Sequence, residues 1–180
     1  SSIGTEKVVI GISGGIDSAV NAALYRSVIP GENLLLVNTP SIFNSETTKR
    51  LARQISENLE TYFAEIPITP FIDASVATLD GLKITSPAGE KILHISDFMK
   101  ENMQARDRSS RILSALSAAF GGIFTCNANK TELSVGYGTL YGDLAGALAA
   151  TADLWKHQVY ELGNSLNNFY GQDVIPKETF

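Results

Sequence analysis

An apolar strand that runs directly into a glycine-rich turn and then a helix is the strongest constraint on how this chain folds. Residues 8–20 read Val-Val-Ile-Gly-Ile-Ser-Gly-Gly-Ile-Asp-Ser-Ala-Val. Gly14 and Gly15 permit backbone angles that a side chain penalises, so successive N–H groups can converge at the positive end of the helix. Because such a turn suits anionic oxygens, the pattern predicts a loop that binds pyrophosphate.

Side chains in the same loop favour a metal-assisted phosphate site. Ser13 and Ser18 add hydroxyl donors, whereas Asp17 places an acid where a phosphate is expected. A Mg²⁺ ion between the two resolves this conflict, because it takes oxygens from both a carboxylate and a polyphosphate. The Walker pattern is excluded because its lysine is missing. The alternative is an ordinary strand-to-helix turn in which Asp17 or Ser18 caps the helix.

Length and composition limit the classes of protein to which the chain can belong. Its 180 residues suffice for one domain, and its net charge of −5, without a basic block, disfavours a nucleic-acid partner. No run approaches the roughly 20 apolar residues of a membrane span. The single cysteine, Cys126, excludes an internal disulfide and a multi-cysteine zinc site. A reducing compartment fits this usage, and we expect a cytoplasmic protein.

The first half of the chain alternates strand and helix patterns. We expect strands at about 7–12, 33–38 and 62–68, with helices between them from Ile16 and from Ser45. This alternation predicts an α/β fold, a Rossmann-like open parallel sheet with helices on both faces. Ligands of such sheets bind beyond the carboxyl ends of the strands, where the loops at 13–18 and 38–41 lie. The residues expected on the buried face of the first helix are Ile16, Ala19, Val20, Ala23, Leu24 and Val28.

In the second half of the chain the hydrophobic periodicity is weaker, and it is interrupted before it resumes. From 73 to 94 the periodic signal fades, and Gly81, Pro87 and Gly89 predict an irregular or mobile connection. A long helix is expected from about Ser96 to the Gly121-Gly122 pair, followed by a strand at 123–126. The last expected helix places one stripe in the core, formed by Trp155, Val159, Leu162 and Leu166.

Four motifs, in order along the chain, resemble one family. The Ser-Gly-Gly-x-Asp-Ser string at 13–18 resembles the signature of the N-type ATP pyrophosphatases. Residues 101–108, 127–143 and 152–162 resemble NAD synthetases, and their sequences are closer to the synthetase domain of the glutamine-dependent form than to the ammonia-dependent enzyme. The resemblance covers most of the chain. It implies an adenine nucleotide alpha-hydrolase-like fold and an ATP-dependent amidation of deamido-NAD through an adenylated carboxylate, which releases AMP and pyrophosphate.

The resemblance also assigns roles to particular residues. It implies that Asp17 and Glu132 hold Mg²⁺ and that Lys156 contacts phosphate oxygens, so these three residues are the expected catalytic set. The expected ATP contacts are Gly11, Ser13, Gly14, Gly15, Asp17, Ser18, Asn127 and Lys156. The expected deamido-NAD contacts are Arg106, Glu132, Tyr137, Thr139 and Asp143.

Several of these assignments have simpler alternatives. Lys156 is also compatible with a solvated lysine at a helix start, and Glu132 with a solvent-facing position, although both alternatives are weaker than the functional interpretation. Arg108 could pair with a substrate phosphate or with Glu101 on the same helix. Cys126 is interpreted as a small buried residue rather than a nucleophile, because neither histidine is placed beside it by the sequence.

The resemblance further implies how the chain relates to a larger protein. We expect residues 1–180 to form a single synthetase domain, a fragment without the amino-terminal glutaminase domain and without a carboxyl-terminal tail. Ammonia or glutamine-derived ammonia would supply the nitrogen, and the protein would form a homodimer or larger homo-oligomer. Two other functions stay open: a GMP- or asparagine-forming ATP pyrophosphatase, and a nucleotide-binding module without catalysis.

Overall fold

Four parallel strands form the centre of the molecule. The computed structural model describes residues 4–41, 44–136 and 138–180. Within them the sheet order is β3-β2-β1-β6, with β1 (Val8–Gly11) and β2 (Leu34–Asn38) in the middle. The outer strands are β3 (Tyr62–Glu65) and β6 (Ile123–Phe124), each parallel to its neighbour. The predicted parallel sheet is confirmed.

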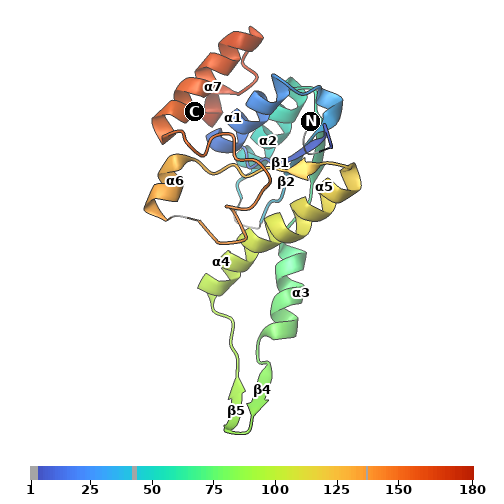
Figure 1. Cartoon of the computed structure of the whole chain (residues 1–180), viewed down its shortest axis with the longest axis vertical. Coiled ribbons are helices and arrows are strands. Elements are labelled where there is room, and N and C mark those ends of the chain that lie inside the picture. Colours follow the sequence, from blue (N-terminus) through green and yellow to red (C-terminus); the bar gives the residue numbers. More distant parts are fainter. Residues whose placement is uncertain (1–3, 42–43, 137) are drawn as a thin grey trace.

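Helices cover both faces of this sheet, because alternate strand residues point to opposite sides. On one face, Ile10 and Leu36 pack in a core with α1 (Ile16–Arg26), α2 (Glu46–Asn58) and α7 (Lys156–Tyr170). On the other face, Val9 and Val37 pack with apolar residues of the long helix and of α3 (Thr69–Leu79). Figure 1 shows these two layers, and both faces of the predicted open sheet are therefore covered.

The long helix predicted from Ser96 exists, and its middle is wound as a π-helix. It comprises α4 (Asp97–Arg106), the π segment η2 (Asp107–Leu113) and α5 (Ser114–Phe120). The Ser96 hydroxyl caps its start by accepting from the Met99 N–H at 3.3 Å. Gly121, with φ of 79°, ends it in the left-handed conformation. Short π segments are rare and widen the turn, so they redirect the side chains they carry.

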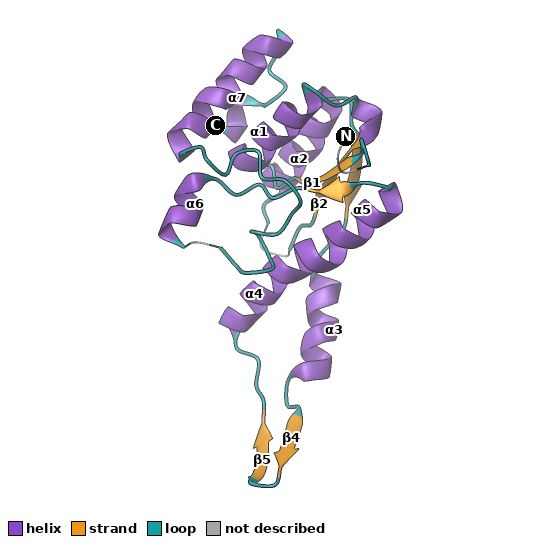
Figure 2. Ribbon diagram, viewed as in Figure 1, coloured by secondary structure: helices purple, strands orange, loops and turns teal. Residues whose placement is uncertain are grey.

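Residues 73–94 differ from the predicted irregular connection. Helix α3 runs through the first part, and β4 (Lys83–Ser86) pairs antiparallel with β5 (Gly89–Ile92) in a hairpin. Together with the start of α4 they form an arm that projects from the body (Figures 1 and 2). The prediction was wrong because the residues from 77 to 94 are all exposed, so no buried face imposes a period on the sequence.

Two residues expected in the core are exposed. Val28 is 78% exposed because α1 ends at Arg26, before the last position of the predicted stripe. Trp155 is 41% exposed because it precedes the first residue of α7, where its ring lies 4.7 Å from the Lys130 ammonium. Val159 and Leu166 of the same stripe are buried as predicted.

Short helices complete the described chain. They are η1 (Gly31–Asn33), α6 (Lys130–Val135) and η3 (Lys177–Thr179). Helix α6 lies close to the start of α7, because the Lys130 N–H donates to the Leu154 carbonyl at 2.9 Å. In the part of the chain that the structure describes, no helix is long and apolar enough to cross a membrane.

Replacing a residue of the central strands should measure how much this core contributes. Leu36 is fully buried, so Leu36→Ala should lower the free energy of unfolding by about 2–5 kcal/mol. Val28→Ala removes apolar atoms from an exposed site and should change that free energy by less than about 0.5 kcal/mol. Denaturant unfolding of both variants checks this, and equal destabilisation would contradict the described placement of Val28.

Candidate functional site

A cavity of about 330 Å³ opens at the carboxyl ends of β1 and β2. The loop after β1 lines it through Gly11, Ser13, Asp17 and Ser18. The segment after β6 contributes a second wall. The cavity is also lined by Thr39, Arg108, Asn127, Glu132 and Asp143. The structure thus brings the predicted phosphate loop to one edge of the sheet together with residues from the distant second half.

The loop is held in shape by its own hydroxyl groups. The Ser18 hydroxyl accepts from the Ser13 N–H at 3.1 Å and donates to the Gly15 carbonyl at 3.0 Å. Gly14 has φ of +86°, and a Cβ there would lie 2.3 Å from the Thr48 carbonyl oxygen, so only glycine fits. Gly15 is the N-cap residue of α1 and no side chain caps the helix, in contrast to the alternative interpretation. The first N–H groups of the helix therefore stay available to an anion.

Asp17 is held between two side chains from distant parts of the chain. Its Oδ2 lies 2.5 Å from the Lys156 ammonium nitrogen, and its Oδ1 accepts from the Asn129 amide nitrogen at 2.9 Å. The side chains of Asp17 and Lys156 are 23% and 40% exposed. Lys156 is therefore not a freely solvated lysine, because its charge neutralises an acid at the edge of the cavity.

Glu132 lies on α6 and faces the same cavity. Its Oε2 accepts from the Asn129 N–H at 3.1 Å, and its own N–H donates to the Asn129 Oδ1 at 3.1 Å, which is a capping box. Among the described residues, no group of three or more His, Cys, Asp or Glu side chains is arranged to hold a metal. Mg²⁺ is usually held by one or two carboxylates together with phosphates and waters. The oxygen donors of Asp17 and Glu132 fit that pattern chemically, and their role as ligands stays a prediction.

A second cavity of about 400 Å³ adjoins the first. It lies between α4 and the described residues that follow α6, of which Thr139 and Asp143 line it. Arg108 and Asp143 belong to the walls of both cavities. Their side chains form an ion pair at 3.3 Å between Arg108 Nη1 and Asp143 Oδ1. The two cavities therefore meet at this pair.

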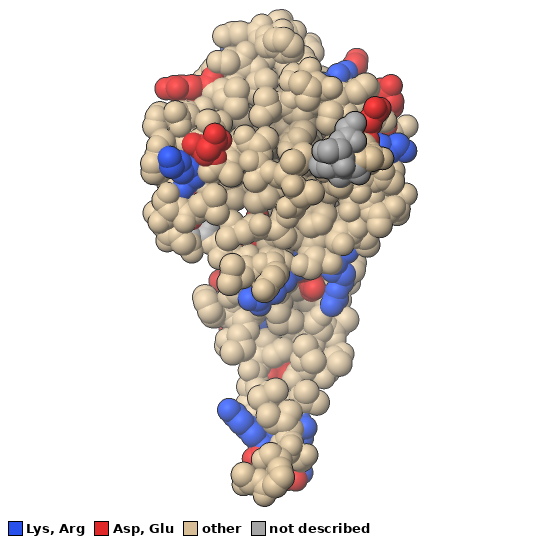
Figure 3. All heavy atoms as spheres, viewed as in Figure 1, with Lys and Arg blue, Asp and Glu red and all other residues tan. Residues whose placement is uncertain are grey.

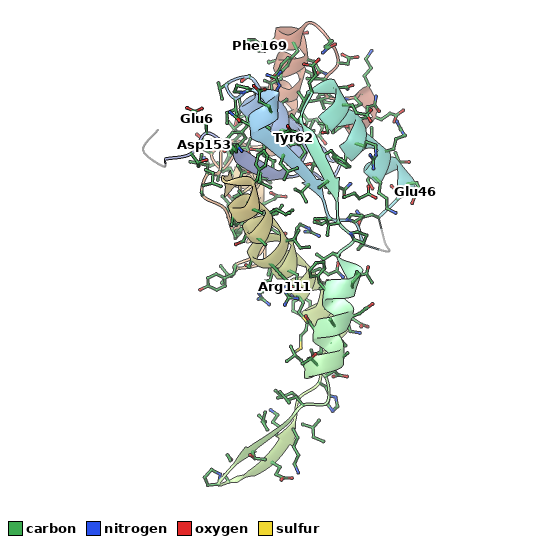
Figure 4. The ribbon with its side chains drawn as sticks, turned by 90° about the vertical axis from the view of Figure 1, so that its right-hand side faces the viewer. Glu6, Glu46, Tyr62, Arg111, Asp153 and Phe169 are labelled. Atoms are coloured by element: carbon green, nitrogen blue, oxygen red, sulfur yellow. The ribbon has the colours of Figure 1, made fainter. Side chains whose placement is uncertain are left out.

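The π segment of the long helix carries Arg108 to this junction. Its Nε donates to the Thr39 hydroxyl at 3.0 Å, so it contacts residues that follow β2 and not Glu101. In Figure 4, Arg111 of the same segment lies where the long helix crosses α3, and its guanidinium lies 6.0 Å from the centre of the Phe71 ring. This contact joins the base of the arm to the helix that carries Arg108.

Other predicted substrate contacts are placed less directly. Arg106 is exposed and lines neither cavity, and its Nε donates to the Leu140 carbonyl at 3.3 Å. Asn127 lines the first cavity and donates from Nδ2 to the Gly11 carbonyl at 2.7 Å. The prediction for Tyr137 lies outside the described residues.

Two site residues were not selected from the sequence. Asn129 joins Asp17 to Glu132, and its Asn-x-x-Glu spacing is a capping-box pattern that could have indicated it. Thr39 orients Arg108, but this contact spans two distant segments and has no local signal.

Cys126 is buried beside the site, as interpreted from the sequence. Its thiol donates to the Asp143 carbonyl at 3.3 Å, and burial raises the pKa of the thiol above its ordinary value. His94 lies on the exposed arm, where its Nδ1 is 3.5 Å from Asp80. His157 is exposed at the start of α7. A buried thiol with a raised pKa is a poor nucleophile, which agrees with the interpretation of Cys126 as a small buried residue.

The raised pKa of Cys126 predicts slow alkylation by iodoacetamide in the native protein at pH 8. The rate should increase with pH because only the thiolate reacts, and should increase sharply in guanidinium chloride, which exposes the thiol. Mass spectrometry of timed samples measures this. Rapid alkylation of native protein at pH 7 would contradict the described environment.

Comparisons with known proteins agree with this geometry. A sequence model of the NAD synthase family matches residues 1–180. The glutamine-dependent NAD(+) synthetase of Thermotoga maritima is 37% identical over 98% of this chain, which spans 29% of the length of that relative. The structure of a glutamine-dependent NAD+ synthetase from Acinetobacter baumannii in complex with ADP superposes with a TM-score of 0.86 at 34% identity, over 98% of this chain and 32% of that one.

A third similarity is to an enzyme named for a related product. The structure of the NMN synthetase from Francisella tularensis superposes with a TM-score of 0.83 at 30% identity, over 99% of this chain and 66% of that one. These proteins share the α/β fold with its parallel sheet flanked by helices. With a match over its whole length, the chain belongs to the NAD synthase family.

Proposed function

We propose that this chain carries out the ATP-dependent amidation of deamido-NAD to NAD, as part of a longer protein. The observation that carries this proposal is the meeting of two cavities at Arg108 and Asp143. One cavity contains the glycine-rich loop that is predicted to bind the phosphates of ATP, and the other is lined by Thr139 and Asp143, which the family resemblance connects with deamido-NAD. A reaction between the two ligands needs their reacting atoms to meet at such a junction.

The first cavity suits the triphosphate of ATP. The uncapped N–H groups at the start of α1, with the hydroxyls of Ser13 and Ser18, can bind pyrophosphate oxygens as they gain charge. The amide of Asn127, which lines the other wall, would contact the nucleotide. The structure of the Acinetobacter relative is a complex with ADP, which supports an adenine nucleotide as a ligand of this family. Mg²⁺ held by Asp17 and Glu132 would neutralise the departing pyrophosphate.

Lys156 has two positions in this proposal. In the structure its ammonium pairs with Asp17. For Asp17 to take a cation, the ammonium would turn from this carboxylate to the phosphate oxygens. The side chain is 40% exposed, so it can move without unpacking the core.

The reaction balances in two displacements. A carboxylate oxygen of deamido-NAD attacks the α-phosphorus of ATP, the bond between the α-phosphorus and the bridging oxygen breaks, and pyrophosphate leaves. Ammonia then attacks the carbonyl carbon of the acyl-adenylate, loses a proton, and AMP leaves with the bonding electrons. The guanidinium of Arg108 can pair with the substrate carboxylate or the adenylate phosphate. Catalysis is then mainly positioning and charge stabilisation.

The nitrogen source and the location follow from the same proposal. The chain spans 29% of the length of its Thermotoga relative, which is named as glutamine-dependent. We propose that a glutaminase region elsewhere in the longer protein supplies ammonia to this part. A cytoplasmic location, where ATP and dinucleotides are available, agrees with this role.

Asp17→Ala should lower the rate of NAD formation by at least about 100-fold while the fold stays intact, because the site loses a charged group at the phosphate loop. The assay supplies Mg-ATP, ammonium and deamido-NAD to the protein at its natural length, and measures NAD and pyrophosphate. A parallel assay with nicotinate mononucleotide in place of deamido-NAD tests whether the protein forms NMN, the product in the name of the Francisella relative.

Asp153→Ala is the matched control, because Asp153 is exposed on the body and lines neither cavity (Figure 4). Circular dichroism verifies that both variants fold. An Asp17→Ala variant with full activity and unchanged Mg²⁺ dependence would contradict the role of Asp17. A wild-type protein that forms neither amide would contradict the proposed function.

We further propose that a second copy of the chain covers the arm. By the hairpin register, Leu82, Ile84 and Leu93 share one face, and they are 44%, 42% and 37% exposed. An isolated two-stranded hairpin is marginally stable in water, so this face favours a partner. Figure 3 shows the arm narrowing away from the body, with acidic and basic side chains both present on it. Phe98, 73% exposed, lines the second cavity, so a twofold partner at the arm would also close the substrate site.

Ile84→Asp should therefore convert a dimer to a monomer, because it places a charge in the shared apolar face. Light scattering coupled to size-exclusion chromatography measures the mass, which should fall by half. Val28→Asp, at another exposed apolar residue, should leave the mass unchanged. A wild-type monomer, or a dimer that survives Ile84→Asp, would contradict this interface.

A further inference from the structure

One fully buried asparagine contacts the two carboxylates of the proposed metal site, one through its side chain and the other through its backbone N–H. Asn129 is 0% exposed and is the N-cap residue of α6. Its Nδ2 donates to Asp17 Oδ1 at 2.9 Å, and its Oδ1 accepts from the Glu132 N–H at 3.1 Å. Its backbone N–H donates to Glu132 Oε2 at 3.1 Å. A single residue thus contacts both carboxylates, which come from helices far apart in sequence.

The two ends of the Asn129 side-chain amide have separate partners, and the partners fix its orientation. A carboxylate oxygen can only accept a hydrogen bond, so the NH₂ group of Asn129 must face the Asp17 carboxylate. A backbone N–H can only donate, so the side-chain oxygen of Asn129 must face the Glu132 N–H. Hydrogen bonds in a buried network are stronger than in water. The direction of the Asp17 carboxylate is therefore defined by Asn129 on one oxygen and by Lys156 on the other.

Helix capping alone does not require an amide at this position. The cap uses only the side-chain oxygen, and serine caps helices about as well as asparagine. The contact with Asp17 uses the NH₂ group. Serine has no such group, and its side chain is too short to replace it. The feature that distinguishes Asn129 from an ordinary cap is thus its bond to Asp17.

We propose that Asn129 is a positioning residue that keeps the Asp17 and Glu132 carboxylates directed at one divalent cation accompanying ATP. This inference rests on the proposed function. When Lys156 moves from Asp17 to the phosphates, the Asn129 bond is the described side-chain contact that still orients Asp17. The residue acts through its two neighbours and does not itself touch the reacting atoms.

Two variants separate positioning from capping. Asn129→Ser keeps a good cap and loses the bond to Asp17, whereas Asn129→Ala loses both. Mn²⁺ is the probe, and its binding to the protein at natural length with α,β-methylene-ATP is followed by the electron paramagnetic resonance signal of free Mn²⁺. Loss of an outer-shell partner typically weakens metal binding about 10- to 100-fold. The dissociation constant for Mn²⁺ should therefore rise by about that factor in both variants.

Stability and kinetics give independent readouts. The melting temperature of Asn129→Ser should lie closer to that of the wild type than Asn129→Ala does, because only alanine removes the cap. The Mg²⁺ concentration for half-maximal NAD formation should rise in Asn129→Ser, with most of kcat recovered at saturating Mg²⁺. Ser96→Ala, which removes the cap of α4 far from Asp17, should lower stability without changing Mn²⁺ binding.

The outcomes distinguish the inference from the function on which it rests. Unchanged Mn²⁺ binding by Asn129→Ser, with normal binding and turnover by the wild type, would overturn the positioning role alone. A wild-type protein that binds no Mn²⁺ with the nucleotide analogue would overturn both. Weaker binding in both variants, together with a higher melting temperature in the serine variant than in the alanine variant, supports the inference.

Discussion

The contact of Asp17 with Lys156 and Asn129 determines how the two halves of the chain meet. Asp17 lies in the first turn of α1, where the helix dipole favours an acid, and its partners belong to α7 and to the start of α6. Two like charges about 4 Å apart repel by about 4 kcal/mol at an effective dielectric constant of about 20. A phosphate could not approach Asp17 against such repulsion without a cation. In the structure, the ammonium of Lys156 supplies a positive charge beside Asp17.

The topology of the sheet explains why distant segments form one cavity. Strand β1 lies between β2 and β6, so the chain leaves β1 toward one side and returns on the other. The loops after β1 and β6 therefore leave adjacent strands at the same edge, and such switch points are where open α/β sheets bind ligands. Strand order thus brings the loop after β1 close to the segment that carries Asn127, Asn129 and Glu132.

The sequence predicted those parts of the structure that have a local physical cause. The apolar strand and the glycine turn of residues 8–20 predicted the strand, turn and helix found there, and the Ser96 cap and Gly121 predicted both ends of the long helix. The arm was missed because an exposed hairpin needs no buried face. The bonds of Asn129 to Asp17 and of Arg108 to Thr39 could not be read from spacing, since strand order determines them. The π segment could not be predicted either, because its 7 residues are too few to show a hydrophobic periodicity different from that of an α-helix.

Arg108 shows what that unpredicted geometry makes possible in the proposed reaction. Its guanidinium already pairs with one carboxylate, that of Asp143, at the junction of the two cavities. A substrate carboxylate that enters from the second cavity can replace Asp143 without leaving any charge unpaired on the arginine. The planar fork of five donors can hold Thr39 and a carboxylate together, which the point charge of a lysine does less well. Exchange of one carboxylate for another would thus bring the nucleophile to the α-phosphate at little electrostatic cost, provided that Asp143 finds a new partner on the incoming dinucleotide.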